Sequence, residues 1–419
     1  MDYQLESNLE SHNDSLALFQ GPDKDFSILA KQWIEYRPIN VISEGSVLEF
    51  NVPASSSDYI NLKETRLQVK AKITKEDNSP VSREDLVAPS NLALQSIFSQ
   101  VDLLLQQQPL YSVGTNYPYK AYLDAMLQSR GELSEAKLSS QLYYKENASN
   151  TDATDPNGGD TSIYLRWMQT RDGQIFDMSG PLYLDMFDQS RLLLNGVPLQ
   201  IKLWPSKNAF RLMSDTGGYK LQIVDASLFL CMTKVHSGVL LAHSHTLKDS
   251  PALYPMVRSD IKTYSLTQGE FSFGVDDLFQ GEVPDQLILG LVSSQGYIGA
   301  FHRSPYAFRH YHCNFISFTI DGQNVPGKPL TPNYETGNYI EAFQTLHQRG
   351  EVNIDREAYP KGFCLYVLDI LENTTIKKRG KSRLELKFNK PLPESCTLVA
   401  YAKFQGLVQI DNSRNVYTF

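Results

Sequence analysis

The strongest constraint on the fold is an internal repeat with a period near 220 residues (339 − 119 = 220). The segment Tyr119–Gln128 aligns without a gap with Tyr339–Gln348, and Arg-Gly-Glu follows closely after both. Apolar side chains recur every three or four residues in each segment, which predicts a short amphipathic helix. Upstream of each helix, at 101–109 and 318–326, lies a predicted strand that ends in polar residues and a proline.

A third pair of segments recurs at the same offset. Alternate apolar residues, which point to one face of a strand, match there: Leu67 with Leu287, Val69 with Leu289, and Ala71 with Leu291. The shared order and nearly constant offset of three elements favour duplication over chance similarity. The chain is therefore predicted to contain two homologous β domains.

The composition agrees with β structure. Aromatic residues make up 11% of the chain, and with Val, Thr and Ile they fit a pleated, half-buried surface better than a helix. Sequence patterns predict strands at roughly 46–52, 64–73, 97–105, 197–203, 219–232, 286–293, 314–320, 363–370, 383–389 and 397–404. Helical periodicity is scarce, and Pro, Gly, Asn, Asp and Ser predict surface loops at 74–90, 145–161 and 205–218.

The predicted fold class is all-β, a double jelly roll of two tandem eight-stranded antiparallel β-sandwiches with short helices in the loops. Each repeat would hold about eight short strands and one helix, the inventory of a jelly roll rather than of an up-and-down barrel. The predicted division is a flexible, polar and acidic N-terminal arm at 1–28, a first jelly roll at 29–235 and a second at 236–419.

The charge balance limits the class of partner. Lys+Arg 39 against Asp+Glu 47 gives a net charge of −8, which argues against tight binding of nucleic-acid phosphates. No apolar run approaches the ~20 residues that span a bilayer. The N-terminus lacks the basic and apolar regions of a signal peptide. We expect a protein made inside the cell without a signal peptide and without a membrane span.

Histidines that are close in the sequence are the best candidates for a metal site. They are His243 with His245, and His302, His310 and His312 with Cys313. Alternate residues on a strand share a face, so the paired histidines could reach one ion. No third ligand stands at a recognisable spacing, and neighbouring aromatic residues explain the second group as packing. No metal is predicted.

The sequence carries no motif of known chemistry. G-x-S-x-G, H-E-x-x-H and P-loop patterns are absent, and the glycine pairs at 158–159 and 217–218 sit in polar segments. A glycosidase-type pair stays open among the carboxylates Asp185, Asp188, Asp276, Asp277 and Asp369, because pairing across a fold is invisible in sequence. Solvated loop charge is the simpler interpretation. No catalytic residue, cofactor or enzymatic activity is predicted.

Three further features have simple interpretations. The basic stretch 377–383 could touch phosphates or serve as a nuclear address, but it also suits a turn that enters the strand at 383–389. Four widely spaced cysteines are interpreted as buried thiols: Cys231, Cys313, Cys364 and Cys396. Asn147 and Asn373 begin glycosylation tripeptides, which are chance matches without a secretory route.

These observations leave two classes of function. Exposed aromatic side chains on a tandem β scaffold could stack on sugar rings, as in a carbohydrate-binding protein. The same surface could instead serve assembly, because large interfaces use broad apolar and aromatic patches rather than convergent polar groups.

Several stretches resemble the capsid proteins of Polinton (Maverick) elements and the related adintoviruses. They are Ile39–Val41, Phe50–Pro53, Asp58–Leu62, Leu94–Asp102, Asn116–Tyr122, Gly322–Pro326 and Gly362–Asp369. The resemblance covers roughly residues 30 to 410, and its motifs are structural phrases rather than sites of chemistry.

The resemblance implies a double jelly-roll major capsid protein of the lineage shared with adenovirus hexons. In that lineage two jelly rolls stand side by side, and three chains form a trimer with a pseudo-hexagonal outline that tiles an icosahedral shell. Neighbouring capsomers and penton or minor capsid proteins are the implied partners, and virions would assemble in the host nucleus or cytoplasm. A single-jelly-roll penton or minor capsid protein, which would form pentamers, is the alternative. The repeat argues against it.

Overall fold

The computed structural model describes residues 27–110, 112–128, 132–347, 352–370 and 379–419. Strands of the first half are β1 (Ile28–Tyr36), β2 (Leu48–Val52), β3 (Asp58–Lys75), β4 (Val87–Pro89), β5 (Phe98–Leu105), β6 (Gln108–Pro109), β7 (Phe176–Gly180), β8 (Leu199–Pro205), β9 (Leu212–Ser214) and β10 (Tyr219–Val235). Strands of the second half are β11 (Ala252–Leu266), β12 (Ser272–Asp276), β13 (Gln286–Ser293), β14 (Cys313–Ile320), β15 (Gln323–Asn324), β16 (Leu365–Asp369), β17 (Ser382–Phe388), β18 (Cys396–Ile410) and β19 (Val416–Thr418).

Helices occupy the connections between these strands. They are α1 (Ala93–Ser96), α2 (Tyr117–Gln128), α3 (Glu132–Ser139), α4 (Thr161–Thr170), α5 (Asn208–Arg211), α6 (Ser237–Thr246), α7 (Ser294–Ile298), α8 (Ile340–His347) and α9 (Tyr359–Gly362). Among the described residues no helix is long and apolar enough to cross a membrane.

One sheet topology occurs twice along the chain. The first half has sheets of order β1-β10-β3-β7 and β2-β8-β5-β6, and the second has β11-β18-β13-β16 and β12-β17-β14-β15. β1 pairs antiparallel with β10 in the first half, as β11 does with β18 in the second, and the remaining strand pairings are antiparallel too. This is the jelly-roll order, so the predicted double jelly roll is confirmed.

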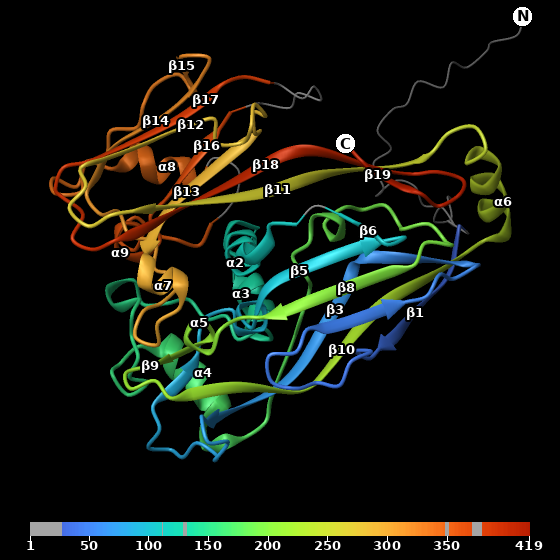
Figure 1. Cartoon of the computed structure of the whole chain (residues 1–419), viewed down its shortest axis with the longest axis horizontal. Coiled ribbons are helices and arrows are strands. Elements are labelled where there is room, and N and C mark those ends of the chain that lie inside the picture. The colour runs from blue at the N-terminus through green and yellow to red at the C-terminus, as the bar shows by residue number, and fades with distance from the viewer. Residues whose placement is uncertain (1–26, 111, 129–131, 348–351, 371–378) are drawn as a thin grey trace, which may run out of the picture.

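The helices that revealed the repeat lie at equivalent places in the two sandwiches. α2 lies between β6 and β7 and α8 between β15 and β16, which hold equivalent places in the two sheet orders, and the structure thus confirms the helices predicted at 119–128 and 339–348. Figure 1 shows α2 beneath β11 and β18, between the two halves. Of the Arg-Gly-Glu motifs, Arg130, Gly131 and 349–351 lie outside the described residues.

Equivalent central strands differ in burial. In β3 the predicted alternation is confirmed, since Leu67, Val69 and Ala71 are buried while Arg66 and Lys70 are exposed. In β13 all 8 residues are buried. A strand buried on both faces reads as a continuous apolar run, which is the pattern of Leu287–Val292.

Three predicted loops are partly ordered structure. Segments 74–90 and 205–218 contribute β4 and β9, which pair with each other and are buried. At the end of 145–161, Asp160 caps α4, because its carboxylate accepts hydrogen bonds from the backbone N–H groups of Ser162 (2.8 Å) and Ile163 (3.3 Å). Most of the predicted arm, residues 1–26, lies outside the described residues, while Ile28 already belongs to β1.

Candidate functional site

The histidine candidates do not form a metal site. His243 and His245 lie on α6 rather than on a strand, and residues two apart on a helix point to opposite sides. His243 Nδ1 instead lies 2.9 Å from the hydroxyl of Tyr59. Among the described residues no three His, Cys, Asp or Glu side chains gather around an ion-sized space.

The second histidine group is an aromatic stack. The ring of His310 stacks on Tyr334 with centroids 4.2 Å apart, and His312 meets it edge-on at 4.9 Å. Burial lowers the pKa of His310 to about 4, so the ring is neutral at pH 7. His302 is exposed, and Cys313 is a buried free thiol like the other three cysteines. The interpretation as packing and buried thiols is confirmed.

The carboxylate candidates are dispersed over the molecule. Asp276 pairs with Arg383 (2.8 Å), Asp277 accepts a hydrogen bond from the backbone N–H of Gly281 (2.6 Å), and Asp369 accepts one from Gln286 (2.8 Å). These bonds belong to strand ends and turns. Only Asp185 and Asp188 line the same cavity.

The described part of the basic stretch forms a turn into β17. The backbone N–H of Gly380 donates to the carbonyl of Gly281 (3.1 Å), and that of Lys381 donates to Asp321 Oδ1 (2.9 Å). Lys377 and Lys378 lie outside the described residues. Of the tripeptide asparagines, Asn147 caps a short 3-10 helix, while Asn373 also lies outside the described residues.

The most developed polar site joins the two jelly rolls. Its centre is Lys120 on α2, whose Nζ lies 2.7 Å from Asp124 Oδ2 and 3.1 Å from Asp185 Oδ1. Lys120 and Asp124 are one helical turn apart, and Asp185 comes from the connection that follows β7. These three residues belong to the first jelly roll, and their side chains are almost fully buried.

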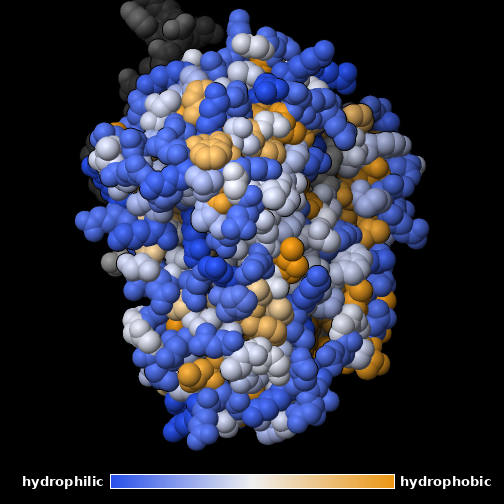
Figure 2. Space-filling model, turned by 60° about the vertical axis from the view of Figure 1, so that its left-hand side comes forward, coloured by the Kyte–Doolittle hydropathy of each residue, from blue (hydrophilic) through white to orange (hydrophobic). Residues whose placement is uncertain are grey.

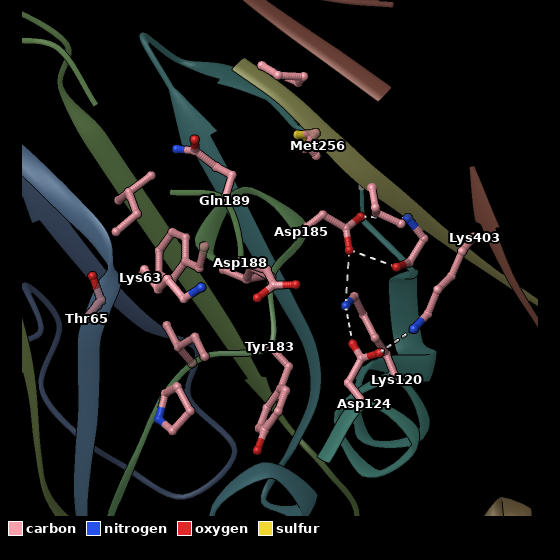
Figure 3. Close-up of a pocket in the computed structure, with 18 of the residues that line it drawn as sticks. Lys63, Thr65, Lys120, Asp124, Tyr183, Asp185, Asp188, Gln189, Met256 and Lys403 are labelled. Carbon is pink, nitrogen blue, oxygen red and sulfur yellow. Dashed lines mark hydrogen bonds and ion pairs between the residues drawn. The ribbon is translucent and has the colours of Figure 1, made fainter. Parts of the chain in front are cut away.

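Side chains of the second jelly roll complete this site. The hydroxyl of Tyr401 on β18 donates to Asp124 Oδ1 (2.7 Å), and Lys403 Nζ lies 3.5 Å from the same oxygen. Ser259 on β11 donates its hydroxyl (2.8 Å) and its backbone N–H (2.8 Å) to the two oxygens of Asp185. Figure 3 shows Lys120, Asp124, Asp185 and Lys403 converging beside a cavity of about 540 Å³.

Mutual pairing keeps the charges of this network in place. Burial lowers the pKa of Lys120, but the attraction of Asp124 and Asp185 raises it by more, and the net pKa lies well above its usual value. For Asp124, burial raises the pKa while Lys120 and Lys403 lower it by more, so the net pKa is lowered. Asp124 and Asp185 are thus both paired with Lys120. Carboxylates engaged in this way suit a structural joint between the jelly rolls rather than proton donation in general acid catalysis.

Stacked aromatic rings form a second part of the joint. Tyr122 on α2 stacks on Tyr306 of the second half, with centroids 4.2 Å apart and planes at 1°. Tyr119, also on α2, stacks on Tyr297 of α7 at 5.5 Å. The hydroxyls of Tyr306 and Ser96 lie 2.6 Å apart in the buried interior. The apolar face of α2 therefore packs between the halves.

A third part is an ion cluster at the edge of the joint. Asp152 of the first half pairs with Arg303 (2.8 Å) and with Arg309, both from the second half. Both arginines also reach Glu394, at 3.3 Å and 3.5 Å. Tyr311 donates its hydroxyl to the same carboxylate (3.0 Å). Ionic and aromatic contacts together hold the two jelly rolls side by side.

Sequence reasoning found only part of this joint. It identified Asp185 as a carboxylate of interest and α2 as an amphipathic helix. The spacing of Lys120 and Asp124 on one helix was the available signal for an ion pair. Tyr401 and Lys403 are separated from them by more than 270 residues, so nothing local could connect them.

No family model matches the sequence. A protein of Caenorhabditis elegans described as uncharacterized is 25% identical over 422 residues, which cover 94% of this chain and 98% of that protein.

Solved viral structures share the fold. A chain of the Sputnik virophage structure has a TM-score of 0.66 at 12% identity, covering 99% of this chain and 93% of that one. The Faustovirus major capsid protein has a TM-score of 0.55 at 10% identity, covering 94% and 92%. The mavirus major capsid protein has a TM-score of 0.53 at 9% identity, covering 100% and 96%. The chain has the double jelly-roll fold of these proteins.

Proposed function

We propose that this chain is a structural major capsid protein that associates as trimers of pseudo-hexagonal outline, which tile an icosahedral viral shell. The observation that carries this proposal is one jelly-roll topology repeated within a chain that matches capsid chains over nearly its whole length. Two similar sandwiches fixed side by side give three chains six similar units, which suit a near-hexagonal lattice.

The finer assignment is to the capsid proteins of Polinton (Maverick) elements and adintoviruses. Two observations support it: the stretches that resemble those proteins, and the nearly full-length relative in a nematode. The chain would be made inside the host cell and reside in the virion capsid. Penton or minor capsid proteins would fill the vertices.

The proposal assigns a simple role to each part of the chain. Residues 28–235 and 236–419 are the two assembly units, and residues 1–27, which precede β1, are an arm that contacts neighbouring capsomers. No catalysis is included, because the buried carboxylates of the joint are paired with lysines. The free energy of assembly would come from burial of surface between chains.

The first test is the mass of the purified protein by light scattering coupled to size exclusion, followed by negative-stain imaging. We expect three times the chain mass of 47.4 kDa, and shells of hexagonally packed capsomers in any large fraction. A stable monomer that binds a glycan would overturn the proposal in favour of the carbohydrate-binding alternative.

The single-jelly-roll alternative is wrong, because both sandwiches are complete.

A further inference from the structure

A largely apolar pocket lies where the chain passes from the first jelly roll to the second, beside the connecting helix α6. This helix follows β10 and precedes β11, and Figure 1 shows it at one end of the molecule. The cavity measures about 580 Å³, within the range of about 300–1,000 Å³ that is typical of ligand pockets. Both halves contribute apolar lining residues, among them Leu192, Leu194, Val235, Val239, Leu247 and Leu253.

Helix α6 borders this pocket without burying any of its own 10 residues. A helix of this length is marginal in water by itself, and most helices in proteins are stabilised by packing of an apolar face. α6 has apolar side chains to pack, but Val239 and Leu240 are only half-buried and Leu241 is 73% exposed. The described residues therefore leave the pocket side of α6 incompletely packed.

The N-terminal arm joins the folded part of the chain at the rim of this pocket. Ser27 and Ile28, the first described residues, both line it. The backbone carbonyl of Ser27 accepts a hydrogen bond from the backbone N–H of His236, directly before α6 (2.8 Å). Residues 1–26 precede this point, so the arm starts beside the pocket.

The arm contains one run of consecutive apolar residues, residues 16–19, with the sequence Leu-Ala-Leu-Phe. Seven residues, 20–26, separate this run from Ser27, and an extended chain of that length spans up to about 25 Å. Gly21 and Pro22 lie within the connection and favour a turn, so the chain can reverse its direction there. Such a short tether keeps the run near the pocket at an effective concentration on the order of millimolar.

The charges of the arm and the pocket are complementary. Residues 1–26 contain six acidic residues and one lysine, a net charge of −5 (1 − 6 = −5). Arg191 and His243 line the pocket, whereas none of its described lining residues is an aspartate or glutamate. Arg191 donates to the backbone carbonyl of Leu253. Asp14 and Asp23 flank the apolar run, and a carboxylate there can pair with this guanidinium.

The face of the molecule in Figure 2 offers the apolar run no comparable binding place. Apolar side chains there form small separate groups among hydrophilic ones. Burial of Leu and Phe side chains is favourable roughly in proportion to the apolar area removed from water, so a concave apolar wall binds them better than a small flat group. The pocket beside α6 provides such a wall.

We infer that residues 16–19 of the arm occupy the pocket beside α6 of their own chain, with their apolar side chains against Leu194, Val239 and Leu253. This contact would complete the packing of α6 and fix the point from which residues 1–15 extend. The inference goes beyond the proposed capsid function and does not depend on it, because a single chain contains both the run and the pocket.

The test measures the reactivity of a cysteine placed in the arm of the full chain. All four native cysteines are buried, so the thiol reagent DTNB reports mainly on the added one. Leu18→Cys should react about tenfold more slowly than Ser7→Cys, which lies in the arm outside the run, because a docked thiol is shielded from the reagent. Adding Val239→Glu should remove this difference, since a charged side chain would then line the pocket.

Leu241→Glu is the matched control, because Leu241 lies on the same helix but does not line the pocket. Leu18→Cys should stay protected in that background. Leu253→Glu, at a residue that is 44% exposed, repeats the pocket test if Val239→Glu lowers the unfolding temperature. Equal reactivity of Leu18→Cys and Ser7→Cys would overturn the inference, as would protection that survives both pocket variants.

Coexpression of two variants distinguishes the chain's own arm from the arm of a second copy. One chain carries Leu18→Cys with Val239→Glu, and the other carries Leu18→Glu with an intact pocket. If the run binds within its own chain, the added cysteine stays reactive. Protection would place the run in a second copy and overturn the inference. Neither result alters the mass that tests the capsid function, so the two proposals can fail separately.

Discussion

Lys120 and Asp124 place two opposite charges where water does not reach. Their side chains are 7% and 6% exposed. Removing such charges from water costs several kcal/mol per ion, which their attraction and hydrogen bonds must offset. The pair is therefore better understood as fixing how the two jelly rolls meet than as a large source of stability.

The substitution Asp124→Asn tests this view at the residue scale. It leaves Lys120 buried with only Asp185 as a charged partner, and we expect a loss of about 3–5 kcal/mol in the free energy of unfolding, measured by urea denaturation at a fixed protein concentration. Glu341→Gln is the control. It removes an exposed pair with Lys328 and should cost less than about 1 kcal/mol. Equal losses in both variants would contradict the view.

Glu146 predicts a pH dependence of stability. Burial raises its pKa to about 7, and Arg166, whose guanidinium lies 3.8 Å away, opposes this only in part. An acid whose pKa is higher in the folded than in the unfolded chain stabilises the fold at low pH. That contribution is lost as the pH rises from the unfolded value of about 4.5 through 7.

Glu146→Gln should remove this dependence. The variant should gain on the order of 3 kcal/mol relative to the wild type at pH 8 and little at pH 4.5, as read from thermal unfolding across that range. The exposed Glu76→Gln should leave the profile unchanged. If Glu146→Gln leaves the pH dependence of stability unchanged, a group other than Glu146 causes that dependence.

Among the elements, strand β13 needs a glycine at position 290, because neighbouring side chains leave no room there for a Cβ atom. A Cβ atom at Gly290 would lie 2.5 Å from Phe308 Cδ1 and 2.7 Å from Leu365 Cδ2. We expect Gly290→Ala to cost about 1–3 kcal/mol through overpacking. Gly274 on the edge strand β12 meets nothing closer than 3.4 Å, so Gly274→Ala should change unfolding by less than about 0.5 kcal/mol. A neutral Gly290→Ala would mean that Phe308 can move aside.

The elements also show what a sequence can reveal. Strands with one buried face, such as β3 and β17, were predictable because burial imposes alternation. β1 was missed because residues 28–33 are exposed on both faces and leave no period. α6 was missed because it has no buried face, and its histidines were placed on a strand for the same reason.

At the scale of the whole molecule, the joint makes the halves depend on each other. Tyr306 and Tyr401 of the second half are buried against Tyr122 and Asp124 of the first, so residues 236–419 alone would expose them to water. We expect this fragment to aggregate or to bind a hydrophobic dye. Coexpression with residues 27–235 should restore a soluble complex, and a fragment that stays soluble and native-like alone would contradict this.

The repeat made the architecture predictable, whereas the joint was not. Helix and strand patterns depend on residues close in the sequence, so the order of elements could be compared between the halves without the three-dimensional structure. The contact of Tyr401 with Asp124 depends on how two finished sandwiches meet. No periodicity or residue spacing within either half indicates how the two sandwiches contact each other.

Because the two sandwiches belong to one chain, assembly depends on protein concentration only through the contacts between chains. In a ring built from these units, every second contact is formed within a chain, at a fixed high effective concentration that dilution cannot lower. Only the alternate contacts require an encounter between chains. The concentration at which trimers form is therefore set by the contacts between chains alone, and selection can weaken or strengthen those contacts without loosening the folded chain.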